Sequence, residues 1–309
     1  MAAISAKDVA ALRAQTGCGM MDCKKALVEA DGNFDEAVKV LREKGLAKAD
    51  AKQSRIAAEG LVDILTCKEC NATAMIEVNT ETDFVAKNDG FKAFVKSVLV
   101  TILKNKPADV DALLACTLDG SDVTVEAEVK NQTFVIGEKI TIRRFVLVEG
   151  PVGTYIHGAG ATGVVISFEA DDAVANHANF AEVGKNIGMQ AAAMNCLYTT
   201  REDVPASVVE SEKNILLAQI ANDPKNANKP DAVKEKMVSG RINKYYETNC
   251  LAEQAYVKDE DLSVTQYLDA SAKEMGGSLK LKAFFRYEKG EGLEKREDNF
   301  AEEIASMLK

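Results

Sequence analysis

Residues 80–91 read TETDFVAKNDGF, and residues 171–180, which read DDAVANHANF, repeat part of this pattern. Four positions of the first copy recur 89 residues later: Asp83, Val85, Ala86 and Phe91 correspond to Asp172, Val174, Ala175 and Phe180. In both copies two short apolar runs precede the motif, and an apolar stripe at helical spacing follows it. This internal repeat predicts an α+β core made of two hairpin-plus-helix units.

The first unit is expected within residues 57–148, and the second within residues 149–200 and 250–289. Each hairpin has two apolar strands around a turn: strands 61–65 and 74–78 in the first copy, and 152–156 and 164–168 in the second. Further elements are predicted as a helix over 123–136, a strand over 139–148 (KITIRRFVLV), a helix over 264–275 and a strand over 279–287 that rejoins the core sheet.

The segment before the repeat, residues 1–56, has the pattern of three short helices. They are predicted over 6–14, 20–30 and 34–44, and Gly45 is expected to end the third. About forty residues bury only a small core, so this bundle needs tight packing or a neighbouring element. A polar, Ala- and Lys-rich segment over 46–58 is expected to link it to the core.

Residues 201–249 predict two long helices joined by a loop at 222–230 that is rich in Asn, Pro and Lys. The apolar stripe on each helix is thin, which is typical of a protruding antiparallel hairpin with a partner surface, and self-association is one option. The last segment, residues 290–309, is expected to form a C-terminal helical module with an amphipathic helix over 300–308.

The composition limits the function. The chain has 309 residues, a formal charge of −10 and 47% apolar residues, which is the range of folded globular proteins. An acidic chain repels phosphate backbones, so we expect no direct nucleic-acid binding. No apolar run of about 18 residues is present and the first residues do not resemble a signal peptide, so we expect a cytoplasmic protein without membrane contact. The seven scattered cysteines predict reduced thiols.

The sequence contains few motifs that indicate catalysis, nucleotide binding or metal binding. The chain contains no GxxxxGK[ST] motif and no GxGxxG between a strand and a helix. His157 and His177 lack partners at metal-ligand spacing. Cys67 and Cys70 form a CxxC pair without a second pair, so a four-ligand metal site cannot be completed and an ordinary hairpin turn is favoured. We therefore expect no catalytic residues, no metal and no cofactor, and a protein that is not an enzyme.

The stretch from Thr82 to Val85 has two interpretations. Thr82 or Asp83 caps a helix, with Phe84 and Val85 buried as its first apolar turn. Alternatively, Phe84 is an exposed anchor for a protein partner, because the second copy has Ala173 at that position and the shared architecture does not require an aromatic there. The comparison of the two copies favours the anchor.

Met20 and Met21 follow a glycine-bounded turn. Neighbouring residues cannot face the same side of a helix, so at least one methionine is expected to be exposed. We expect Met20 to pack inside the bundle and the other to suit an adaptable protein contact.

Two ordered signatures make the chain resemble the bacterial elongation factor Ts family. The first comprises Leu12-Arg13 and residues 16–27, TGCGMMDCKKAL, and the second comprises Glu77-Val78-Asn79, residues 82–88, TDFVAKN, and Phe91. Colinear matches follow as IRR at 142–144, YIHG at 155–158, FRYE at 285–288 and GEG at 290–292. The resemblance covers essentially the whole chain, although Cys18 replaces a common Ala and the 222–230 loop is longer than expected.

The resemblance implies a guanine-nucleotide exchange factor for elongation factor Tu during polypeptide elongation. It implies that residues 1–56 form a domain like the ubiquitin-associated (UBA) domain, that 201–249 form a dimerisation module and that 290–309 form a C-terminal module. By the same resemblance, Thr82, Asp83, Phe84 and Val85 enter the G domain of elongation factor Tu and disturb its magnesium site. Further partner contacts carried over in this way are Arg13, Met20, Met21, Lys24 and His157.

Three other functions stay open from the residues alone. The three N-terminal helices suit a module that binds ubiquitin-like folds, although this leaves the repeated core unexplained. The helical hairpin suits a structural oligomer or scaffold. A thiol enzyme would use Cys67 and Cys70.

Overall fold

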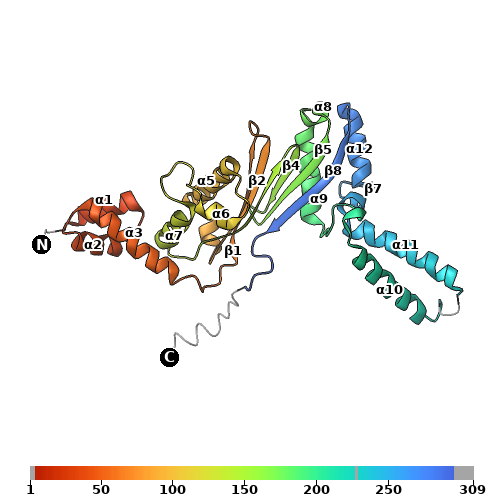
Figure 1. The fold of residues 1–309 in the computed structure, drawn as a ribbon, viewed down its shortest axis with the longest axis horizontal. Helices are drawn as coiled ribbons and strands as arrows, with labels where there is room; N and C mark the ends of the chain where they lie inside the picture. The colour runs from red at the N-terminus through yellow and green to blue at the C-terminus, as the bar shows by residue number, and fades with distance from the viewer. Residues whose placement is uncertain (1–3, 227–228, 296–309) are drawn as a thin grey trace. The chain divides into compact units, whose positions relative to one another are not determined.

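The computed structural model describes residues 4–226 and 229–295 of the 309-residue chain. The helices and strands belong to two compact units (Figure 1). The N-terminal unit comprises the chain up to Leu147, Gly158–Thr162 and the segment from Tyr287 onward. The C-terminal unit comprises Val148–His157 and Gly163–Arg286. Both units combine helices with a small β-sheet, so the predicted α+β class is confirmed.

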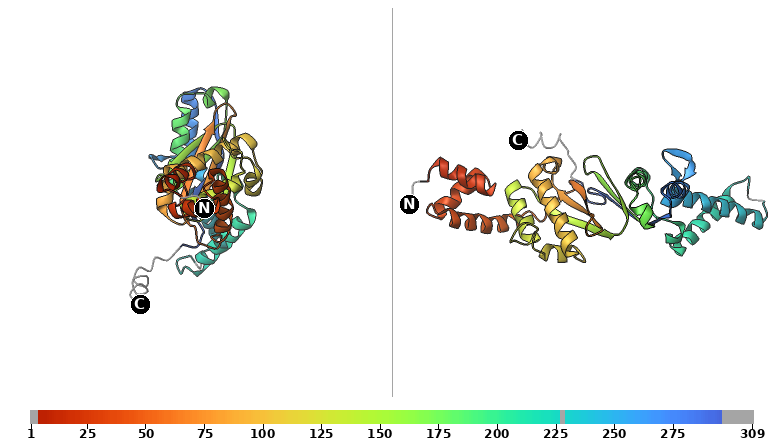
Figure 2. Two further views of the ribbon diagram at one scale, coloured as in Figure 1. Left: turned by 90° about the vertical axis from the view of Figure 1, so that its left-hand side faces the viewer. Right: turned by 90° about the horizontal axis from the view of Figure 1, so that it is seen from above.

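Three helices form a bundle at the start of the N-terminal unit, drawn in red in Figures 1 and 2. They are α1 (Ala6–Thr16), α2 (Met20–Glu29) and α3 (Phe34–Asp50). Ser5 begins α1 because its hydroxyl accepts a hydrogen bond from the Asp8 N–H at 3.2 Å, while the Asp8 carboxylate accepts from the Ser5 N–H at 3.0 Å. The three predicted helices are all present.

Helix α3 continues past Gly45, so the prediction that this glycine ends the helix is wrong. A Cβ atom at Gly45 would lie 3.0 Å from the Phe134 ring of α7 (Val125–Ile136). The glycine therefore allows two helices to approach closely. Phe134 and Val135 also pack against the bundle core, which supplies the neighbouring element that the small bundle needs. This core consists of Val9, Leu12, Cys18, Cys23, Ala26, Leu27, Ala37 and Leu41.

The first copy of the repeat is a three-stranded sheet with helix α5 (Asp89–Asn105) packed against β1 and β2 (Figure 1). Its strands are β1 (Glu59–Cys67), β2 (Ala72–Thr80) and β3 (Thr141–Glu149), in the order β1-β2-β3. Strands β1 and β2 pair antiparallel, with Glu59 opposite Thr80 and Cys67 opposite Ala72. A short helix, α6 (Val110–Ala115), precedes α7 and was not predicted. Six residues are too few for a clear helical period.

The second copy has the same plan. Its strands are β4 (Val152–His157), β5 (Thr162–Ala170) and β8 (Leu279–Glu288), in the order β4-β5-β8. The prediction that the last strand rejoins the core is thus confirmed. The helices of this copy are α8 (Asp172–Ala175), α9 (Phe180–Ala193) and α12 (Val264–Met275). Strand β4 and helix α9 approach closely because both carry glycine: a Cβ at Gly153 would lie 2.4 Å from the Gly184 Cα.

The predicted helical hairpin is present as α10 (Ala206–Asn222) and α11 (Asp231–Asn249), which lie side by side (Figure 2). Four residues form its buried seam: Leu216, Ile220, Val238 and Ile242. A small two-stranded sheet of β6 (Ala255–Tyr256) and β7 (Asp259–Ser263) follows, and two short 3-10 helices, η1 (Arg201–Asp203) and η2 (Leu251–Glu253), flank the hairpin. The helix predicted over 300–308 lies outside the described residues.

One prediction about the cysteines is wrong. Cys67 and Cys70, in the turn between β1 and β2, form a disulfide. The turn brings their Cα atoms to 5.5 Å, which is within the range that a disulfide bridges. The other five cysteines are not in disulfides, and burial raises the pKa of the Cys196 thiol to about 11. Among the described residues, no helix combines the length and the apolar character needed to span a membrane.

Candidate functional site

The candidate site is the junction between β2 and α5, residues 80–88, which we call the first junction. A one-turn helix, α4 (Asp83–Lys87), fills it. Asn88 ends α4 and begins α5, because its side-chain oxygen accepts a hydrogen bond from the Phe91 N–H at 3.1 Å. Val85 is 7% exposed and packs in the core with the fully buried Phe91. The inner side of α4 is therefore fixed by apolar packing.

Two acidic side chains hold the start of the junction to the loop between α7 and β3. The Glu138 carboxylate accepts hydrogen bonds from the Thr82 N–H at 2.9 Å and from the Thr82 hydroxyl at 2.6 Å. In the opposite direction, the Lys139 N–H donates to the Glu81 carboxylate at 2.7 Å. These bonds form a clasp between two loops that are 56 residues or more apart in the sequence. Sequence reasoning missed Glu138, because no local pattern links it to Thr82.

Phe84 lies on the outer side of α4 and is 78% exposed. Its neighbours do not cover it: the Lys87 ammonium lies 5.7 Å from the ring centroid. Lys87 also donates to the Asp83 carboxylate at 2.6 Å, and this hydrogen bond holds the pKa of that carboxyl below its usual value. The exposed aromatic predicted from the repeat is confirmed. A large apolar side chain that is exposed on a backbone held in place by hydrogen bonds is typical of a contact with another protein.

The corresponding second junction, residues 170–176, is built differently. Strand β5 begins 90 residues after β2, whereas α8 begins 89 residues after α4, so the connection from the strand to the short helix is one residue shorter in the second junction. Asp171 accepts hydrogen bonds from the Ser278 N–H at 2.7 Å and the Ser278 hydroxyl at 2.8 Å. Val174 is buried, as is its counterpart Val85, and the exposed position carries Ala173. The two copies thus share the inner position and differ at the outer one.

The structure places the other predicted contact residues on two elements. Arg13 on α1 and Lys24 on α2 are exposed on the bundle. Met20 and Met21 begin α2 and are 52% and 61% exposed, so the prediction that Met20 packs inside the bundle is wrong. The inner face of α2 is already filled by other side chains, namely Cys23, Ala26 and Leu27.

His157 belongs to the C-terminal unit and not to the unit that carries the first junction and the bundle. It ends β4, is exposed, and its Nδ1 atom lies 3.0 Å from the Tyr155 hydroxyl.

A buried carboxylate connects three segments of the N-terminal unit. Glu77 is fully buried and accepts from the Arg143 and Arg144 guanidiniums at 3.1 and 2.6 Å and from the Gly290 N–H at 2.8 Å. Burial alone would raise the pKa of Glu77, but the hydrogen bonds from Gly290, Arg144 and Asn79, together with the charge of Arg144, outweigh burial and lower the pKa. The network fixes the segment after β8 against the first sheet. The residues of this network come from the motifs at 77–79, 142–144 and 290–292. The distances between these motifs in the sequence did not predict that they meet.

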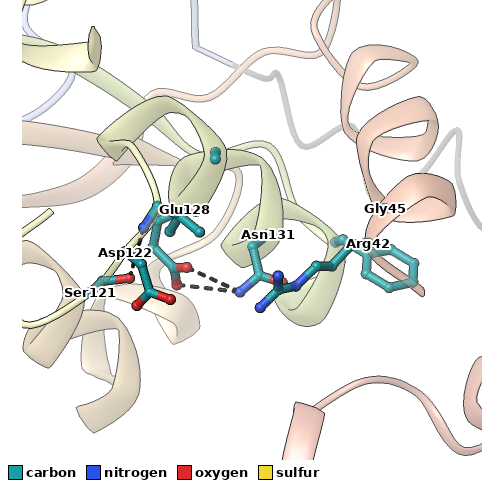
Figure 3. A pocket seen from close by; sticks show the side chains of 9 residues that line it. Arg42, Gly45, Ser121, Asp122, Glu128 and Asn131 are labelled. Carbon is teal, nitrogen blue, oxygen red and sulfur yellow. Dashed lines mark hydrogen bonds between the residues drawn. The ribbon is translucent and has the colours of Figure 1, made fainter. Parts of the chain in front are cut away.

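The cavity in Figure 3 does not belong to this site. It has a volume of about 220 Å³ and lies where α3 approaches α7, with Arg42, Asp122 and Glu128 among its lining residues. Glu128 there accepts hydrogen bonds from Asn131 at 3.2 and 3.4 Å (Figure 3). None of the predicted contact residues lines it. Within residues 4–226 and 229–295, no group of three His, Cys, Asp or Glu side chains is arranged to hold a metal ion.

Comparison with known proteins gives one consistent result. Residues 81–291 match the family described as "Elongation factor TS". The elongation factor Ts of Syntrophotalea carbinolica is 46% identical over 309 residues, and the match covers 99% of either chain. The elongation factor Ts of Clostridioides difficile is 45% identical and covers 100% of either chain, and that of Trichlorobacter lovleyi is 45% identical and covers 98% of either chain.

Proposed function

This chain belongs to the elongation factor Ts family of translation elongation factors, and from that premise we propose that it releases GDP from the GTPase elongation factor Tu and allows GTP to bind again. It would act in the cytoplasm during polypeptide elongation, as a binding protein that makes and breaks no covalent bond. The observation that supports a role for the first junction is Phe84, which is 78% exposed on a backbone held by the Glu138 clasp.

Nucleotide exchange of this kind is a matter of differential binding. If the factor binds nucleotide-free elongation factor Tu more tightly than the GDP-bound form, it weakens GDP binding by the same ratio. The contacts that matter are those that exist only when the nucleotide site is disturbed. We assign these contacts to the exposed side of the segment Thr82–Val85, with Phe84 inserted between side chains of the partner's G domain, while the Val85 side chain stays in the core.

The partner's magnesium ion explains why such an insertion releases GDP. Magnesium bridges the nucleotide phosphates to the protein and is the largest local charge in such a site. A displacement of the partner groups around this ion therefore weakens GDP binding. Asp83 lies next to Phe84 and carries a carboxylate that is already paired with Lys87, so Phe84 is the better candidate for the wedge.

The remaining contact residues would provide binding that is equal in both nucleotide states. Met20 and Met21 give the bundle an adaptable apolar surface, flanked by the exposed cations Arg13 and Lys24. His157 would add a contact from the C-terminal unit. Loss of uniform binding weakens association without lowering the maximal rate of exchange.

The release of a fluorescent GDP analogue from purified elongation factor Tu, chased with excess GDP, tests this proposal. Catalytic amounts of this protein should accelerate release strongly. Phe84→Ala should lower the maximal rate about 30-fold, the effect of removing a contact worth about 2 kcal/mol at an interface hot spot. Leu197→Ala is a matched control, because Leu197 is 63% exposed on the C-terminal unit and has no assigned contact.

Two outcomes would count against the proposal. No acceleration by the folded protein would remove the exchange function. An unchanged maximal rate for Phe84→Ala would remove the role of Phe84 and leave the exchange function standing. Circular dichroism of both variants should match the parent protein, since neither side chain is buried.

The helical hairpin is a separate question, and we propose that it mediates a homodimer. The exposed apolar residues Ile215 and Leu217 on α10 and Val233 on α11 lie outside its own seam. Light scattering after size exclusion should give the mass of two chains, and Ile215→Asp should give one. A single-chain mass for the parent protein at high concentration would contradict the proposal.

A further inference from the structure

A second cavity, independent of the proposed exchange function, lies beside the first sheet. It has a volume of about 230 Å³. Its walls come from residues 55–57, the end of β2, the start of β3 and residues 293–294, all within the N-terminal unit. None of the residues carried over as contacts to elongation factor Tu lines it.

Three cations line this cavity: Arg55, Lys139 and Arg143. The Lys139 ammonium donates only to the carbonyl oxygens of Gln53 at 2.5 Å and Arg55 at 3.0 Å, and it pairs with no carboxylate of the described residues. Arg143 shares the Glu77 carboxylate with Arg144, and its guanidinium also donates to the Glu291 carbonyl oxygen. The one acidic residue in the lining is Glu294. The lining therefore carries more positive than negative charge.

A buried oxygen in the same wall lacks a donor. Asn79 is 2% exposed, and its side-chain nitrogen donates to the Glu59 carbonyl and to the Glu77 carboxylate, both at 3.1 Å. This pairing fixes the orientation of the amide, and it leaves the Asn79 Oδ1 atom without a hydrogen bond from any described residue. An unsatisfied buried acceptor destabilises the fold, so a donor that reaches it would be favoured. The cavity thus offers cations for an anion, and an unsatisfied acceptor lies enclosed in its wall.

We propose that this cavity binds the phosphate group of a small phosphorylated molecule. Arginine and lysine are the usual partners of phosphate oxygens. A donor from the same ligand, either a proton retained by the phosphate or a hydroxyl of its organic part, satisfies the Asn79 oxygen after a small displacement of the neighbouring side chains. The apolar side chains of Ile56 and Leu293, 41% and 36% exposed, provide a surface for the organic part.

A ligand bound in the cavity would disturb the hydrogen bonds of the first junction. Arg55 pairs with the Glu81 carboxylate at 3.2 Å, and the Lys139 N–H donates to the same carboxylate. An anion at Arg55 competes with Glu81 for the guanidinium. The amide resonance of Glu81 should therefore shift when the ligand binds.

Calorimetric titration of the full chain with inorganic phosphate, sulfate and ribose 5-phosphate tests the proposal. Phosphate retains an O–H group at neutral pH and sulfate does not, so phosphate should bind at least tenfold more tightly, by analogy with the rejection of ligands that leave a buried polar group unpaired. Tighter binding of ribose 5-phosphate than of phosphate would identify an organic phosphate as the ligand, and equal binding would identify the free anion.

Variants locate the site. Lys139→Met should weaken phosphate binding at least tenfold, whereas Lys92→Met, which removes the same charge from the exposed face of α5, should leave it unchanged. Because Lys139 also holds two backbone carbonyls, a second measurement uses the unmodified protein. Phosphate should shift the side-chain amide resonances of Asn79 in a nitrogen-15 spectrum. Equal binding of sulfate and phosphate, parent-like binding by Lys139→Met, or an unmoved Asn79 amide would overturn the proposal.

Discussion

The two junctions of the repeat have the same inner side and different outer sides. Val85 and Val174 both fill the core below their short helices, and Phe91 and Phe180 both begin the apolar stripe of the long helix that follows. On the outer side, Phe84 stands where the second junction has Ala173. The inner positions are therefore what the fold requires, and the outer position of the first junction is free to serve another purpose.

The backbones differ as well as the side chains. In the first junction the Thr82 N–H and hydroxyl donate to Glu138, whereas Asp171 at the corresponding position of the second junction accepts from Ser278. Glu138, which binds Thr82, lies in the loop before β3, and Ser278, which binds Asp171, lies just before β8. In each copy, the residue that holds the junction thus comes just before the last strand of that copy's sheet.

The largest expected effect is the difference in stability between replacing the buried Phe91 and replacing the exposed Phe84. Phe91→Ala should lower the free energy of unfolding by about 3–5 kcal/mol, because it leaves a cavity in the core. Phe84→Ala should change it by less than about 0.5 kcal/mol, as at other exposed sites. Urea unfolding followed by circular dichroism measures both. A loss of stability in Phe84→Ala similar to that in Phe91→Ala would show that the ring is part of the core.

The next effect concerns the clasp. Glu138→Ala removes both acceptors of Thr82, so the short helix that carries Phe84 becomes less well positioned, and the maximal rate of GDP release should fall about fivefold to tenfold, which corresponds to about 1–1.4 kcal/mol. Glu138→Gln retains one acceptor oxygen and should recover much of the rate.

Ser278→Ala is the matched control for the clasp, because it removes the hydroxyl that donates to Asp171 in the second junction. It should leave the rate of GDP release unchanged. If Glu138→Ala weakens association with elongation factor Tu but leaves the maximal rate intact, Glu138 does not position Phe84.

Local patterns in the sequence account for much of the fold. The strands around Leu61 and Val164 and the helices that begin near Phe91 and Phe180 follow from apolar runs and helical spacing. The exposure of Phe84 follows from its comparison with Ala173, since a position that differs between copies of one architecture is not needed by the core. These features depend on residues that are close together in the chain.

The missed features depend on residues that are far apart. Glu138 holds Thr82 from 56 residues away, and Gly290 donates to Glu77 from 213 residues away. Gly45 looked like a helix end because the Phe134 ring that it accommodates is not a sequence neighbour. A single sequence contains no periodic signal for such contacts.

A smaller effect distinguishes the electrostatics of the two junctions. The Lys87 hydrogen bond lowers the pKa of Asp83 below the ordinary 3.8, and the hydrogen bonds from the Ser278 hydroxyl and N–H lower that of Asp171. With folded pKa values below the unfolded ones, each carboxylate stabilises the fold above about pH 4, and this contribution is lost as the pH falls through the folded pKa.

High salt should change the pKa of Asp83 more than that of Asp171. In about 1 M NaCl the Debye length is about 3 Å, so the Asp83 pKa should rise toward 3.8 while the Asp171 pKa stays low, because Lys87 and Lys289 are charged and Ser278 is not. Side-chain carboxyl NMR titrations at low and high salt measure both pKa values. Equal salt shifts for the two groups would contradict the different origins assigned to them.

The smallest expected effect comes from placing the aromatic in the second junction. Ala173 is exposed, so Ala173→Phe should change the free energy of unfolding by less than about 0.5 kcal/mol. It should also leave GDP release unchanged, and it should not rescue Phe84→Ala in the double variant, because the second junction has Asp171, bound by Ser278, at the position where the first has Thr82, bound by Glu138. If the double variant regained the parent rate, an exposed aromatic on either short helix would suffice, and the clasp would have no part in the difference between the two copies.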